Sequence, residues 1–416
     1  KTMSLRGILS VAGAHPAFRR HLTALPETGS LSPITVRQGA KPAYIGCLWH
    51  QLNAPILVLT PRPDDARRLQ DQLLTYLGED APVYLLPEPE VLPFERLAVD
   101  AHTGHQRLTA LAALASPPTN KDGNDNIHPL VVTSVGAALR LTLPPDIMTN
   151  RYEDGDARDA AHVALGQRVR LSQMLTSWVD LGYRNEPLVE SPGCFSQRGG
   201  IIDVFPSDSD LPFRIELWDD EIDTIRTFDP VTQRSVSDVQ SVTLIPAREQ
   251  LPGIAQRPLV EEQVSRLDFS RCSGEIQDRF EEEIESLYDA PNNETLSLYN
   301  GLLNHNNVLE YLPAGGFLLL DRASQIEAEA LELEERFQRM RETREERGEL
   351  PRNFPLPYLT WSRFQESMDG RKQVSLQSWV SGDEDHIFQP AVPYYGNLKQ
   401  LASDVRKYQG EGKSVV

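Results

Sequence analysis

Short apolar runs alternate with longer stretches of helical periodicity in the first part of the chain. Residues 56–60, 83–86 and 130–134 are almost wholly apolar and predict buried strands. Helices are expected near them at residues 43–51, 63–77 and 106–115, with Pro63 at the first turn of the second helix, where its missing N–H costs nothing. Such alternation predicts a parallel sheet covered by helices on both faces.

A different rhythm follows from residue 156 to 246. A short strand at residues 162–165 and a helix at 170–181 precede apolar runs broken by Pro, Ser and Asp, which is the pattern of an antiparallel meander. In residues 213–218 the alternation is regular. One face carries Phe213, Ile215 and Leu217, and the other carries Arg214, Glu216 and Trp218. The second face is either a binding surface, since Arg and Trp dominate binding hot spots, or a solvated face with Trp218 packed under a loop.

The apolar run at residues 316–321 has the character of a parallel strand, so the chain is expected to return there to the first sheet. The first domain is then discontinuous, formed by residues 1–155 and 247–350, with an insert at 156–246. Residues 327–347 predict a long helix with interleaved Glu and Arg, a solvated face rather than a partner-binding stripe. Beyond a Pro-rich linker, residues 351–416 predict a small α/β domain, and we expect the chain to be a fragment of a longer polypeptide that cuts this domain short.

Charge and cysteine content narrow the class of protein. Lys and Arg number 41 against 60 Asp and Glu, a net charge of −19, so duplex DNA should repel the chain as a whole. Three separated cysteines exclude a disulfide framework and a CxxC zinc site. No histidine pair has metal-ligand spacing, and there is neither a signal peptide nor a membrane-length apolar run. We expect a cytoplasmic protein that holds no metal ion and that contacts other proteins.

The sequence lacks a working nucleotide site. A phosphate-binding P-loop needs G-x-x-x-x-G-K-[ST], and its natural place is at Lys41. With Lys41 as the P-loop lysine, Thr35 and Ala40 stand at the glycine positions and Pro42 at the hydroxyl position. Residues 383–386 spell Asp-Glu-Asp-His without an apolar strand before them and are interpreted as a surface turn. Residues 412–414 spell Gly-Lys-Ser, but Lys407 stands where the first glycine should be, so no P-loop is expected there. No catalytic or cofactor-binding residue is predicted.

The meander also resembles a known domain. The run Arg-Gly-Gly-Ile-Ile-Asp-Val-Phe-Pro at residues 198–206, with ordered matches at 214–216, 219–222, 228–230 and 233–235, resembles the UvrA-interaction domain shared by UvrB and the transcription-repair coupling factors (Mfd). UvrB carries an intact P-loop and a β-hairpin that inserts into DNA. Here residues 87–95 lead directly into a helix containing Arg107, so the chain is more similar to the N-terminal region of the coupling factors.

This resemblance implies a degenerate P-loop, helicase-like α/β domain with an inserted α+β UvrA-binding domain. It implies UvrA contacts by Arg198, Arg214 and Trp218, and we expect Glu216 to orient Arg214. RNA polymerase, DNA, ATP and Mg²⁺ are expected to bind domains absent from these residues, and a C-terminal domain is expected to mask the UvrA surface. The alternatives are a UvrB-like ATPase with an unconventional phosphate site and a binding module for some other partner.

Overall fold

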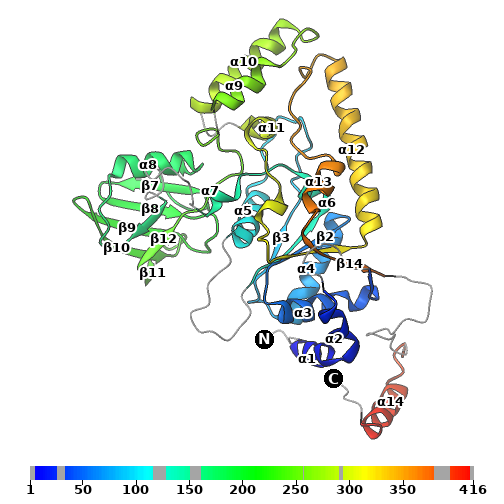
Figure 1. The fold of residues 1–416 in the computed structure, drawn as a ribbon. Coiled ribbons are helices and arrows are strands. Elements are labelled where there is room, and N and C mark those ends of the chain that lie inside the picture. Colours follow the sequence, from blue (N-terminus) through cyan, green and yellow to red (C-terminus); the bar gives the residue numbers. More distant parts are fainter. Residues whose placement is uncertain are drawn as a thin grey trace.

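The computed structural model describes residues 5–25, 33–115, 128–149, 161–255, 257–289, 294–378 and 394–412. Within these ranges the chain forms an α/β body and an inserted β-rich domain that lies beside it (Figure 1). None of the helices in the described part is both long enough and apolar enough to cross a bilayer.

Six parallel strands form the centre of the body. Their order across the sheet is β1 (Ile34–Thr35), β14 (Lys372–Gln377), β13 (Phe317–Asp321), β2 (Ile56–Thr60), β4 (Leu130–Ser134) and β3 (Val83–Leu86). All residues of β2 and β4 are buried, as expected for strands covered on both faces. The three strands predicted from apolar runs in the first part of the chain are therefore confirmed as β2, β3 and β4.

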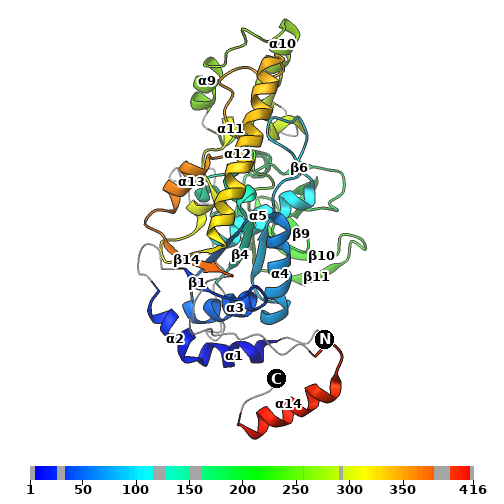
Figure 2. The same ribbon diagram turned by 90° about the vertical axis from the view of Figure 1, so that its right-hand side faces the viewer.

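Successive residues of these strands point into two separate cores, so helices cover both faces (Figure 2). Ile56 and Val58 belong to a core shared with α1 (Arg6–Ala14), α2 (Pro16–Thr23), α3 (Lys41–Leu52) and α4 (Pro63–Leu77). Leu57 and Leu59 belong to the other core, shared with α5 (Ala101–Ala115), α6 (Val135–Leu139), α7 (Pro145–Met148), α12 (Ala323–Glu346) and α13 (Trp361–Met368).

The second core continues upward into a smaller group of helices above the sheet (Figure 1). These are α9 (Arg257–Ser265), α10 (Gly274–Asp289), α11 (Asn300–Leu303) and the 3-10 turns η2 (Glu294–Ser297) and η3 (Val308–Tyr311). Helix α14 (Leu398–Gly410), near the end of the chain, has no buried residue.

The later parts of the chain return to the first sheet. The predicted return at residues 316–321 is confirmed, because β13 pairs in parallel with β2. The separate small α/β domain expected after residue 350 is not what the structure shows for residues 351–378. There β14 pairs with both β13 and β1, and Val374 and Leu376 are buried in the core of the body. Without β14, β13 would be an open edge.

The insert contains a second six-stranded sheet. Its strands, in order, are β11 (Ser235–Asp238), β10 (Glu221–Phe228), β9 (Phe213–Trp218), β8 (Ile201–Phe205), β7 (Cys194–Arg198) and β6 (Arg184–Asn185). All neighbours are antiparallel except β6 and β7, so the predicted meander is confirmed. Helix α8 (Leu171–Asp180) packs Met174 and Trp178 on one face of this sheet, beside the pair β5 (His162–Ala164) and β12 (Ser241–Thr243).

Candidate functional site

The face of the inserted sheet opposite α8 carries the residues that the sequence analysis proposed for binding. The predicted alternation in β9 is confirmed: Ile215 is fully buried, and Phe213 and Leu217 pack on the same core. Because residues directly opposite in a sheet share a face, Arg214 lies beside Asp203 of β8 and Arg226 of β10. Ile201 in turn lies between Arg198 and Glu216. We call this surface the open face.

Two of the three predicted residues converge on one carboxylate. Arg214 donates from Nε to Asp203 Oδ1 at 2.6 Å and from Nη2 to Oδ2 at 2.8 Å, and Arg198 donates from Nη2 to Oδ2 at 3.4 Å. The Asp203 side chain is 3% exposed, so this charge is well shielded from water. The hydrogen bond with Asp203 raises the pKa of Arg214. Asp203 therefore fixes the geometry of both arginines.

The side chains of Arg214 and Arg198 differ in how much of each is exposed to solvent. Arg214 also lies over the Phe228 ring, 4.6 Å from its centroid, and donates to Gln233 Oε1 at 3.2 Å. Its side chain is 20% exposed, against 58% for Arg198. Arg198 thus has donors available to a partner, whereas Arg214 is held mainly by its own domain.

Trp218 ends strand β9 at the edge of this surface. Its residue is 80% exposed, so the alternative in which it packs under a loop does not occur. Asp219, which follows it, has a φ of 58° and starts the turn into β10. An indole held in water by a rigid hairpin offers a large contact area with little loss of conformational entropy on binding.

The expected role of Glu216 is wrong. Its carboxylate accepts from Arg226 Nη2 at 2.9 Å, and Arg214 is instead oriented by Asp203. Both acids lie on the same face as Arg214, but Asp203 is directly opposite it on β8 while Glu216 is displaced by two residues along β9. Asp203 was missed by the sequence analysis, although its place between core residues Ile202 and Val204 put it on the arginine face.

A second cluster of charges occupies the position where a P-loop would lie. The chain leaves β1, makes the 3-10 turn η1 (Gln38–Ala40) and enters α3 at Lys41. The Lys41 ammonium donates to Asp321 at the end of β13, and the two side chains are 2% and 5% exposed. Arg322 bridges Asp321 at 3.2 Å and Asp65 at 2.8 Å. Burial lowers the pKa of Lys41, and the attraction of Asp321 opposes that shift.

The two other candidate motifs of the sequence lie wholly or partly outside the described residues. The Asp-Glu-Asp-His run at residues 383–386 lies outside the described residues, as do Lys413 and Ser414. In the described ranges no group of three or more His, Cys, Asp or Glu residues could hold a metal ion.

Comparison with known proteins finds a family model that matches the insert and relatives that match between about half and three quarters of the chain. A family model described as the UvrB interaction domain matches residues 161–249, which contain the open face. A transcription-repair-coupling factor of Myxococcus xanthus is 37% identical over 215 residues, covering 50% of this chain and 17% of the relative. The Bacillus subtilis (strain 168) protein of that name is 28% identical over 310 residues, covering 72% of the chain and 24% of the relative. The Escherichia coli (strain K12) protein is 28% identical over 197 residues, covering 47% and 15%.

These matches establish homology to the transcription-repair-coupling factors, with the UvrB interaction domain included. The matched region spans a quarter or less of the length of these curated relatives.

Proposed function

We propose that this homologue of the transcription-repair-coupling factors recruits UvrA through the open face of its inserted sheet. In this proposal Trp218 and Arg198 contact UvrA directly, and Arg214 supports both the contact and the position of Asp203. The observation that carries the proposal is the 80% exposure of Trp218 on the face where two arginines share a buried carboxylate. That combination of an indole and a partly free guanidinium is typical of a binding hot spot.

We further propose that the α/β body is a scaffold without catalytic activity in these residues. The Lys41–Asp321 pair supports this, because the charges that would hold a phosphate and a metal ion are buried against each other. Pro42 follows Lys41 directly, so neither a hydroxyl ligand nor a free backbone N–H is offered at that position. A UvrB-like ATPase would have to displace this buried pair to admit a nucleotide.

By homology, the rest of the coupling factor would bind RNA polymerase and move along DNA with ATP and Mg²⁺, in the cytoplasm, and a C-terminal domain would mask the open face. In that setting the present residues would bring UvrA, and hence nucleotide excision repair, to a stalled polymerase. The negative charge of the chain, −19 in all, suits a module that binds protein rather than duplex DNA.

The test is a calorimetric titration of purified UvrA into the wild-type chain and the Trp218→Ala variant. Loss of a hot-spot indole should weaken binding by about 2 kcal/mol, or roughly thirtyfold in Kd. Leu331→Ala is the matched control, since Leu331 is 51% exposed on α12, outside the inserted domain, and its variant should bind as wild type. Equal affinity of the Trp218→Ala and wild-type chains would overturn the assignment of this surface.

A further inference from the structure

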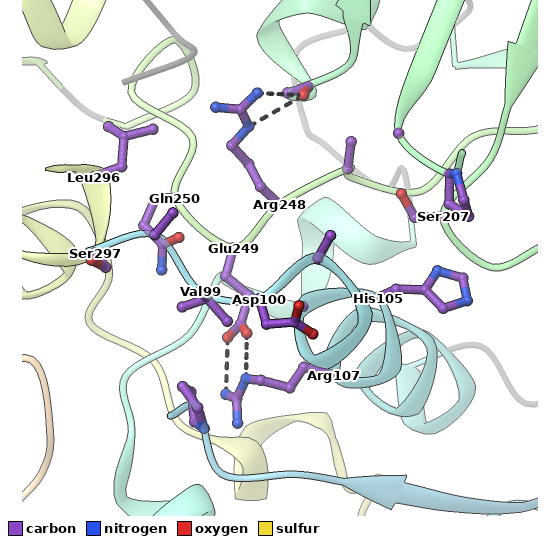
Figure 3. A pocket seen from close by; sticks show the side chains of 18 of the residues that line it. Val99, Asp100, His105, Arg107, Ser207, Arg248, Glu249, Gln250, Leu296 and Ser297 are labelled. Carbon is purple, nitrogen blue, oxygen red and sulfur yellow. Dashed lines mark hydrogen bonds and ion pairs between the residues drawn. The ribbon is translucent and has the colours of Figure 1, made fainter. Parts of the chain in front are cut away.

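A cavity of about 730 Å³ lies where the inserted domain meets the body (Figure 3). Its walls come from several parts of the chain. The body contributes the start of α5 with the residues before it, Arg140, and residues 296–300, and the insert contributes residues 182–193 and Ser207 together with residues 247–250, which leave it. The volume is in the range of small-molecule sites. Trp218, Arg198 and Lys41 do not line it.

Four arginines line this cavity, and one of them is fully neutralised. Arg107 makes a two-point ion pair with Glu249, at 2.5 and 3.0 Å (Figure 3). It also donates to the Pro87 carbonyl at 2.8 Å. Arg107 is 2% exposed, so this ion pair forms a rigid part of the cavity wall with balanced charge. Because Glu249 is already paired with Arg107, it cannot fully neutralise a second guanidinium.

Arg140 lies next to that pair without a partner of its own. It is 9% exposed and lines the cavity. Among the described residues, its guanidinium has neither a hydrogen bond nor an ion pair, since Glu249 and Glu88 act on it only at longer range. Burial, and then repulsion from Arg107, lowers the pKa of Arg140 to about 10. A buried cation left in this state is costly unless an anion reaches it.

The opposite wall adds further positive charge. Arg248 donates from Nε and Nη2 to the Gly182 carbonyl at 3.2 and 2.8 Å, and burial followed by repulsion from Arg184 lowers its pKa to about 10. Of the remaining acids in the lining, Asp100 accepts from the Thr103 amide at the start of α5, and Glu186 lies with Arg184 on the insert side. Among the described residues of the lining, four arginines therefore stand against the three acids Asp100, Glu186 and Glu249.

We propose that this cavity binds a small phosphate-bearing anion, of the size of a diphosphate group, between Arg140 of the body and Arg248 and Arg184 at the insert. Phosphate oxygens accept hydrogen bonds from several guanidinium groups at once and would place negative charge beside Arg140. Since the ligand would contact both units, its binding would hold the inserted sheet, and with it the open face, in a fixed position on the body. The free oxyanion and the phosphate end of a nucleotide share this chemistry.

The experiment is a titration of the wild-type chain with pyrophosphate and, separately, with ADP, without Mg²⁺ and at constant ionic strength set with potassium chloride. Calorimetry gives the affinity and thermal unfolding gives the shift in Tm. We expect saturable pyrophosphate binding and a rise in Tm, because a ligand of the folded state stabilises it. Equal affinity for ADP would mean that only phosphate is recognised, and tighter ADP binding that the nucleoside adds contacts. No saturable binding of pyrophosphate would overturn the proposal.

Substitutions of the lining arginines test whether pyrophosphate binds in this cavity. Arg140→Gln should lower pyrophosphate affinity on the order of tenfold, with Arg344→Gln on α12 as a control of equal charge change that binds as wild type. The ligand-free Arg140→Gln chain should be no less stable than wild type, since an unpaired buried charge is removed. Arg248→Gln makes the same test should Arg140→Gln fail to fold. Undiminished binding by the folded variant would show that any anion binds elsewhere. UvrA takes no part in these assays, so their outcome is independent of the open face.

Discussion

Two clusters of basic and acidic side chains in this molecule differ in how far their basic members are exposed to solvent. At the carboxyl end of the parallel sheet, Lys41 and Asp321 are 2% and 5% exposed and satisfy each other. On the inserted sheet, Asp203 is as deeply buried, at 3%, but the arginines that bind it are 20% and 58% exposed. The first cluster is closed on itself, whereas the second leaves part of its charge exposed to solvent, on the same face as the exposed indole of Trp218.

The difference shows how solvent exposure separates a charge cluster that acts only in the structure from one that another molecule can reach. A buried ion pair gains little net stability over an apolar pair, but removing one partner leaves a charge that cannot be solvated. Such a pair therefore persists as structure. A half-open cluster has spare hydrogen-bond donors, and those donors are what a second protein can recognise.

The largest expected effect is on the closed cluster. Asp321→Ala leaves the Lys41 ammonium buried without its partner, and we expect a loss of about 3–5 kcal/mol in the free energy of unfolding, measured by urea denaturation. The double variant Lys41→Met/Asp321→Leu should regain most of that loss, because an apolar pair replaces the charges. If Asp321→Ala were as stable as wild type, the closed cluster would not be the structural element described here.

The open cluster should respond in binding and hardly in stability. Arg198→Ala removes a side chain that is 58% exposed, and should weaken UvrA binding by about 1 kcal/mol, mainly through the rate of association. The effect should shrink as salt is raised, because exposed charges are screened. Stopped-flow association at two salt concentrations measures this, with Arg339→Ala, 66% exposed on α12, as control. Equal association rates for Arg198→Ala and Arg339→Ala would contradict a role for Arg198.

Local patterns were sufficient to predict most elements but not their long-range pairing. The buried strands β2 and β4 are apolar throughout, and β9 alternates because one face meets α8, so both kinds of strand are readable from short windows. The position of β14 between β1 and β13 could not be predicted from a short window, since its pattern fits a small domain as well as the edge of a large sheet. Which acid pairs with a base was equally hidden: Lys41 and Asp321 are separated by 280 residues.

For the open face too, the sequence was sufficient to name exposed residues but not their long-range partners. Trp218 and Arg198 could be named from residue type, strand alternation and resemblance, and the structure leaves both exposed. Asp203 could not be chosen over Glu216 without the register of β8 against β9, because both acids share the face of Arg214. The arginine cavity depends on several distant segments meeting at the junction of two domains, and no short window of sequence contains that arrangement.

Our central proposal is that the open face is the functional surface, and that the carboxyl end of the parallel sheet is not. One chain preparation assayed side by side for UvrA binding and for Mg-ATP hydrolysis tests this directly. We predict saturable UvrA binding that is lost in the double variant Arg198→Ala/Trp218→Ala, and no hydrolysis above background by either chain. Hydrolysis by the wild-type chain, together with UvrA binding that the double variant retains, would contradict it.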